Sequence, residues 1–241
     1  MINPFRELRA FLRAALFEPV GEPPSEAART LARRRWIAGV TLVLGAVTLA
    51  WALRIAPGDP LFYPATLGLA AVWTVGALLS GPLHLGRAHT RSGHRQSRAV
   101  VQSLALGILL LAIFLFGAVL VARIPVLRDP VEVLLDHARF GSLGLVAVLT
   151  AVNAVAEELY FRGALFGAIP RPHAVSVSTL IYTLTTVPTG IPLLVFAAAV
   201  LGAVVGLQRR VTGGVLGPIV THLIWSLGML FLLPYALHLG R

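Results

Sequence analysis

From residue 36 onward, long apolar stretches alternate with short breaks that contain proline, glycine or charged residues. A stretch of about 17 to 25 apolar residues can cross the hydrocarbon core of a bilayer as a helix, because a helix satisfies its own backbone hydrogen bonds. The pattern therefore predicts an all-α fold, a polytopic transmembrane bundle of about seven, possibly eight, helices. The seven expected spans are Trp36 to Ile55, Leu61 to Ser80, Val100 to Ala122, Leu143 to Phe166, Ala174 to Val187, Ile191 to Leu207 and Val215 to Ala236.

Two segments depart from this simple pattern. The fifth stretch is short and rich in Ser and Thr, so we expect a helix that is buried among its neighbours rather than facing lipid. Ahead of the first span, the segment NPFRELRAFLRAALFEPV places its apolar residues near one helical face and its arginines elsewhere, which is typical of an amphipathic helix at the membrane interface. We divide the chain into an interfacial cytoplasmic segment, N-terminal transmembrane helices and a C-terminal core, at residues 1–35, 36–142 and 143–241.

The overall composition agrees with a membrane protein and excludes several kinds of site. Of the 241 residues, 57% are hydrophobic and 12% are charged. The mean hydropathy of +0.83 is far above that of a soluble domain. There is no cysteine, which excludes disulfides, thiolate catalysis and cysteine-based metal sites. Basic residues that are all arginine, with much Ala, Gly and Leu, indicate a bacterial protein.

The 20 arginines stand against 10 acidic residues and give a formal charge of +10. Membrane topology explains this charge without a nucleic-acid partner. With the seven spans and a cytoplasmic N-terminus, 15 of the 20 arginines lie on the cytoplasmic side, where arginine is enriched and meets anionic lipid headgroups. We therefore expect a multi-pass plasma-membrane protein with a cytoplasmic N-terminus. The arginines left on the other side are Arg54, Arg123, Arg128, Arg139 and Arg241.

The fourth span contains three charged residues, in the sequence AVNAVAEELYFRGALF at positions 151–166. A charge at the bilayer centre costs about 3 kcal/mol, so such residues face the protein interior and have partners. Glu158 and Arg162 are four residues apart and can form an ion pair on one face of the helix. Glu157 points about 100° away and has no such partner. A carboxylate in this setting suits a general base, whereas the pair alone could simply hold two helices together.

The last span adds a second group of polar residues. His222 and Ser226 are four residues apart and share one face of an otherwise apolar helix. Asn153 and Thr150 extend a polar stripe along the face of the fourth span that carries Glu157. A histidine and a hydroxyl at helical spacing, in the same chain as an unpaired glutamate, indicate a functional site.

These residues match the motifs of a known family. The sequence EELYFRG fits the EExxxR signature of the CPBP family, the CAAX-protease and bacteriocin-processing group of intramembrane proteases also called Abi proteins. The chain resembles that family from about Leu143 to Pro234. The family's second motif, FxxxH, aligns with YTLTT, which puts Tyr182 at the aromatic position and Thr186 at the histidine position. The third motif, HxxxN, aligns with HLIWS and has Ser226 in place of asparagine.

The resemblance implies an intramembrane endopeptidase acting on a peptide or a membrane protein, with membrane lipids as its other partners. Its site would lie among the fourth, fifth and seventh spans and open to the cytoplasmic side. Glu157 would activate a water molecule for attack on the peptide carbonyl, and Thr186 would orient that water. Glu158 and Arg162 would support the helix.

On the same resemblance, His222 would face Glu157 across a gap wide enough for one amide bond. His222 and Ser226 would donate hydrogen bonds to the oxyanion, and such donors are worth about 3 to 4 kcal/mol each. We expect no cofactor. Zinc is the alternative, yet a catalytic zinc normally takes three protein ligands, and Thr186 would be a poor third beside Glu157 and His222.

Two other functions remain open from the sequence. Because Thr186 and Ser226 replace the family's histidine and asparagine, the chain could be a catalytically degenerate homologue that binds a hydrophobic or lipidated partner segment without cleaving it. A small transporter is the other alternative, because charged residues in membrane helices often mark transport paths. The absence of a repeated half with paired broken helices weighs against transport.

Overall fold

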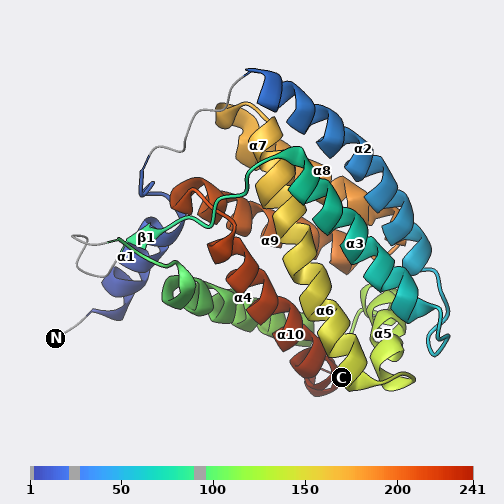
Figure 1. Cartoon of the computed structure of the whole chain (residues 1–241). Helices are drawn as coiled ribbons and strands as arrows, with labels where there is room; N and C mark the ends of the chain where they lie inside the picture. The colour runs from blue at the N-terminus through green and yellow to red at the C-terminus, as the bar shows by residue number, and fades with distance from the viewer. Residues whose placement is uncertain (1–2, 22–27, 90–95, 241) are drawn as a thin grey trace.

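The computed structural model describes residues 3–21, 28–89 and 96–240, in which the chain forms an all-α helix bundle (Figure 1). Six helices within these residues are long and apolar enough to cross a membrane. The predicted class, a multi-pass helical membrane protein, is confirmed. The six are α2 (Ala28–Ala52), α3 (Phe62–Ser80), α4 (Val100–Val121), the continuous helix Leu143–Ala168, α9 (Pro192–Thr212) and α10 (Leu216–Leu239).

The fifth predicted span is also helical, as α8 (Ala174–Thr186), but it has 13 residues and is shorter than the six. Two 3₁₀ turns, η2 (Arg171–His173) and η3 (Val187–Thr189), flank it. Its polar side, with Tyr182 and Thr186, is buried against the bundle. Its other side is not, since Leu180 and Leu184 are 57% and 56% exposed. The expectation of a helix buried among its neighbours is therefore wrong for that outer face.

The N-terminal amphipathic helix is present as α1 (Pro4–Leu16). It begins at Asn3, whose side chain accepts hydrogen bonds from the backbone N–H groups of the first turn. Its inner face packs Ala15 and Leu16 against Leu106 of α4. Its outer face leaves Phe5 82% exposed beside several arginines. This pattern suits a helix lying at the membrane interface.

One helix was missed by the sequence analysis. Residues after the third span form α5 (Pro125–Arg139), which buries Val131 and Leu135 against the ends of α4 and α10. Its charged residues and its internal proline interrupt the apolar pattern on which the span prediction depends. A short antiparallel pair, β1 (Ala88–His89) and β2 (Gln96–Ser97), lies in the connection between α3 and α4.

The helix that carries the charged motif runs through the middle of the bundle. Figure 1 shows its first part, α6 (Leu143–Glu158), between α3 on one side and α10 on the other, and both helices contact it. α4 lies along α10, while α8 and α9 pack against each other. The motif is therefore surrounded by the helices from which a site could be built.

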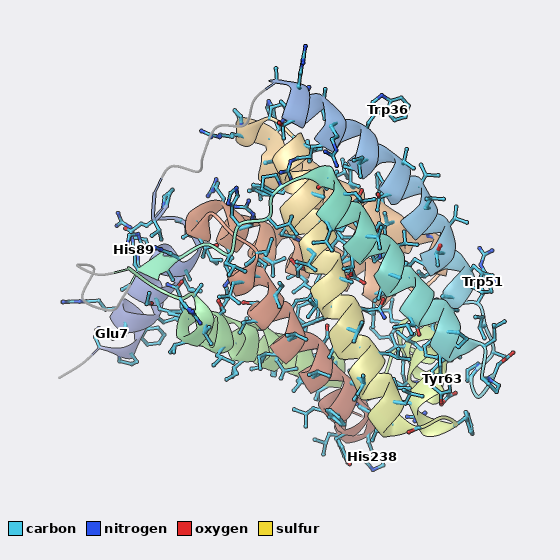
Figure 2. All side chains as sticks on the ribbon, viewed as in Figure 1. Glu7, Trp36, Trp51, Tyr63, His89 and His238 are labelled. Carbon is cyan, nitrogen blue, oxygen red and sulfur yellow. The ribbon has the colours of Figure 1, made fainter. Side chains whose placement is uncertain are left out.

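Aromatic packing fixes α3 against the motif helix. Trp73 of α3 is 1% exposed and stacks on Tyr160, with ring centroids 4.6 Å apart. Tyr160 also donates a hydrogen bond of 2.6 Å to the carbonyl of Ala38 on α2. By contrast, Trp36 and Trp51 point outward from α2, as Figure 2 shows, where lipid would surround them.

Contacts between loops show which connections share an end of the bundle. At one end, Arg35 donates to the carbonyl of Ala168, so the start of α2 lies beside the end of the motif helix. At the opposite end, Arg123 donates to the carbonyl of Gly240, near the C-terminus. α2 and the motif helix therefore run in opposite directions, and α4 and α10 end on the same side of the bundle. Of the arginines used to predict orientation, Arg91, Arg95 and Arg241 lie outside the described residues.

Candidate active site

The helix of the EExxxR motif changes its winding at the motif itself. It is α-helical up to Glu158, π-helical as η1 (Leu159–Leu165), and α-helical again as α7 (Phe166–Ala168). A π turn is wider than an α turn, because each N–H bonds the carbonyl five residues back, and it often occurs at functional sites. The i to i+4 spacing in the sequence predicted an uninterrupted α-helix, since that spacing does not reveal a π turn.

Two buried arginines from other helices hold the π turn. Arg209 of α9 donates to the carbonyl of Arg162 at 2.7 Å, and Arg34 of α2 donates to the carbonyl of Gly163 at 3.4 Å. Both arginines were expected to face lipid headgroups. That expectation is wrong, because Arg34 is 1% and Arg209 8% exposed. Carbonyls that a distorted helix leaves available attract such donors, since an unpaired buried carbonyl is costly.

Glu158 is the centre of a buried polar cluster. One of its oxygens, Oε1, accepts from Nη1 of Arg162 at 3.1 Å and lies 2.8 Å from Nδ1 of His222. Glu158 is 0% exposed, so this contact ties the motif helix to α10 in the protein interior. The predicted ion pair of Glu158 and Arg162 is thus present. The hydrogen bond to His222 is made by Glu158 and not by Glu157.

Glu157 lies beside this cluster with a different partner. Its Oε2 accepts a hydrogen bond of 2.7 Å from the hydroxyl of Tyr182 on α8. No hydrogen bond to its other oxygen, Oε1, is formed among the described residues. His222 and Arg162 are near enough to interact with Glu157 electrostatically. The structure therefore brings both glutamates, the arginine and the histidine into one cluster.

Tyr182 is the site residue that sequence reasoning missed. It was noticed only as the aromatic residue of the second motif, yet its ring is clamped from two sides. The Arg162 guanidinium lies over the ring at 4.6 Å from its centroid, and the Phe161 ring meets it edge-on at 4.7 Å. The sequence did contain a signal for this role. At position 182 the motif requires only an aromatic ring, and the tyrosine here adds a hydroxyl to it.

The two predicted residues that depart from the family motifs make no hydrogen bond to the glutamates within the described part of the chain. Thr186 is buried, and its hydroxyl donates to the carbonyl of Thr183 in its own helix at 2.8 Å. Ser226 lies one turn beyond His222 on α10 and is partly buried. Its hydroxyl makes no hydrogen bond to another described residue, so it is available to a bound molecule.

Several buried polar atoms near the cluster have no protein partner among the described residues. They include Oε2 of Glu158, Nε of Arg162 and Oδ1 of Asn153. An unpaired polar atom in a low-dielectric interior is costly, and internal water is its usual partner. All three belong to the motif helix and lie within about one and a half turns of Glu157.

The side chains present do not fit a catalytic zinc ion. No group of three or more His, Asp or Glu side chains in the described ranges is arranged to hold a metal. Glu158 already bonds both Arg162 and Nδ1 of His222, and Glu157 bonds Tyr182. Zinc would need three ligands free to face it. We therefore derive no step through a metal.

Comparison with known proteins shows which family the C-terminal part of the chain resembles. Residues 139–228 match the family model of the type II CAAX prenyl endopeptidase Rce1-like proteins. The resemblance found in the sequence is thereby confirmed over a segment that contains all six predicted site residues. No curated protein and no solved structure matches the chain. The family and the fold together support an intramembrane protease of the CAAX type.

Proposed function

We propose that the protein is an intramembrane endopeptidase in which Glu157 activates the attacking water. The observation that carries this proposal is the placement of Glu157 within the family-matched segment, with one carboxylate oxygen fixed by Tyr182 and the other without a partner in the described chain. A general base needs a free oxygen within hydrogen-bond reach of its water. Oε1 of Glu157 has no hydrogen bond in the described chain, which supports this role.

The reaction then follows from the positions of the side chains. Water attacks the peptide carbonyl carbon while Glu157 takes one proton from it, forming the new C–O bond and an oxyanion. Collapse of this intermediate breaks the C–N bond, and Glu157 returns the proton to the leaving nitrogen. The products are a new carboxyl group and an amine, and Glu157 ends in its starting state.

His222 supplies the complementary charge for the oxyanion. When it carries both ring protons, Nδ1–H donates to Glu158 and Nε2–H is left for the developing oxyanion. Glu158 thus orients the imidazole, as a carboxylate partner does in other hydrolytic sites. The hydroxyl of Ser226 is a second donor on the same helix face.

The direct test is cleavage by the purified protein in nanodiscs. We would present peptides anchored either by a farnesyl group or by an apolar helix, and compare wild type with Glu157→Gln. Cleavage that falls at least about a hundredfold in the variant, with an unchanged melting temperature, supports the proposal. Equal activity of Glu157→Gln would exclude its role as the base.

A second candidate is a homologue that binds a lipidated or apolar segment without cutting it. The specific observation in its favour is that the Thr186 hydroxyl donates its proton to the carbonyl of Thr183 in its own helix. Thr186→His is the informative variant. If the wild type binds such a segment without cleaving it, and Thr186→His gains cleavage, then the fold is intact and only the catalytic residue is missing.

We also propose the orientation of the protein in the plasma membrane. The end of the bundle that joins the start of α2 to the end of α7 faces the cytoplasm, and the N-terminus with it. This end carries most of the arginines, which the positive-inside rule assigns to the cytoplasmic side. The site would then open towards the cytoplasm.

A further inference from the structure

The hydroxyl of Tyr182 is a group that the family motif does not require and that the structure places on the general base. It donates 2.7 Å to Oε2 of Glu157, from α8 to α6. An aromatic residue without a hydroxyl would fill the same space but could not make this bond. The hydroxyl therefore has to be explained separately from the packing of the ring.

The ring of Tyr182 is held so closely that its hydroxyl has a fixed position. Arg162 covers one face at 4.6 Å from the centroid and Phe161 contacts it edge-on. Gly202 of α9 lies against its edge, since a Cβ at Gly202 would be 3.2 Å from Cδ1 of the ring. Tyrosine has only two side-chain torsions, and contacts from three sides fix both.

This arrangement connects the first motif with the second. Arg162 contacts Glu158 through its Nη1 and lies over the ring of Tyr182, and it donates through Nη2 to the carbonyl of Gly202. One guanidinium thus holds both Glu158, the partner of His222, and Tyr182, the partner of Glu157. The two parts of the site are positioned by the same buried cation.

We propose, on the basis of the function proposed above, that Tyr182 is a positioning residue that fixes the Glu157 carboxylate and directs proton transfer to Oε1. Because the phenol already bonds Oε2, Oε1 is the oxygen left without a hydrogen bond in the described chain and is the better acceptor for the water. Tyr182 thereby orients Glu157 from α8. Thr186, one turn further along the same helix, does not, because its hydroxyl is bonded to its own helix. The chain keeps an ordered base although the histidine position of the motif holds threonine.

The test compares Tyr182→Phe with Tyr160→Phe. Tyr160 is the matched control, because its hydroxyl also makes a buried hydrogen bond, to the carbonyl of Ala38 at 2.6 Å, away from the glutamates. Tyr182→Phe is expected to lower kcat about tenfold to a hundredfold with little change in KM, since a hydrogen bond to a charged group is lost. Tyr160→Phe is expected to lower the melting temperature and leave kcat unchanged.

A spectroscopic measurement separates positioning from simple packing. The infrared carboxyl band of Glu157, assigned as the band lost in Glu157→Gln, is expected to shift in Tyr182→Phe and to stay in place in Tyr160→Phe. A full kcat and an unshifted band in Tyr182→Phe would overturn the inference. If Glu157→Gln itself is fully active, the proposed function fails instead, so the two failures are distinguishable.

Discussion

Oε1 of Glu158 and Nδ1 of His222 lie 2.8 Å apart, although 64 residues separate them along the chain. The contact joins the motif helix to α10 within a bundle in which both side chains are buried. Under the proposed function, the two adjacent glutamates have different tasks. Glu158 would hold the cluster together, whereas Glu157, with one oxygen unbonded in the described chain, would act as the base. The predictions below separate these tasks.

Glu158→Gln is expected to destabilise the protein far more than Glu157→Gln. Removing the Glu158 charge leaves Arg162 buried without its carboxylate, and breaking one side of a buried pair costs about 3 to 5 kcal/mol. Thermal unfolding in detergent measures the difference. A melting temperature equal to that of Glu157→Gln would contradict the central structural role of Glu158.

Gly202→Val is expected to reduce activity strongly, because the added side chain would push against Tyr182 and Arg162. A Cβ at this position would already lie 3.2 Å from the tyrosine ring and 3.4 Å from the guanidinium. Gly117→Val is the matched control on α4, where a Cβ would have no neighbour within 4 Å. Equal kcat/KM in the two variants would argue against a close approach of α9 to the site.

Ser226→Ala is expected to lower kcat about a hundredfold without changing the melting temperature. Its hydroxyl has no hydrogen bond to another described residue, so removing it costs the folded state little, whereas loss of one oxyanion donor is worth about that factor. Steady-state kinetics on the anchored peptides measure the effect. Unchanged kcat would leave His222 as the main donor and remove Ser226 from the mechanism.

Metal chelators are expected to leave cleavage unchanged. The two glutamates and His222 are occupied by Tyr182, Arg162 and one another, which does not fit the three-ligand set of a catalytic zinc. Activity after treatment with 1,10-phenanthroline and dialysis checks this expectation. A loss that is restored by added zinc would show that the ligands rearrange around a metal.

Single cysteines should report the orientation, because the chain has no cysteine of its own. Asp59→Cys lies in the connection between α2 and α3, and His173→Cys precedes α8 at the opposite end. In intact cells, a membrane-impermeant maleimide is expected to label position 59, and position 173 only after permeabilisation. The reverse pattern would place the N-terminus outside.

Much of the fold could be predicted because apolar stretches of membrane length are a strong signal. The amphipathic α1 was also visible in the spacing of its apolar residues. α5 was not, because Pro130 and several charges interrupt its pattern although it packs as a helix. Arg34 and Arg209 were misplaced, since a sequence shows that an arginine lies near a helix end but not which way it points.

The sequence predicted which residues belong to the candidate site better than it predicted how those residues contact one another. The four-residue spacing gave the pair of Glu158 and Arg162, and the resemblance to the family singled out Glu157 and His222. Which glutamate meets His222 depends on how far the motif helix turns before it becomes π-helical, and this depends on tertiary packing. The role of Tyr182 was hidden for the same reason.

The shortness of α8 has a consequence for the surrounding membrane. At 1.5 Å per residue its 13 residues extend about 20 Å, against a hydrocarbon thickness of about 30 Å. Beside the exposed Leu180 and Leu184, we expect the bilayer to thin locally to match this length. Such thinning next to the helix that carries Tyr182 would shorten the path by which solvent and an extended polypeptide reach the interior.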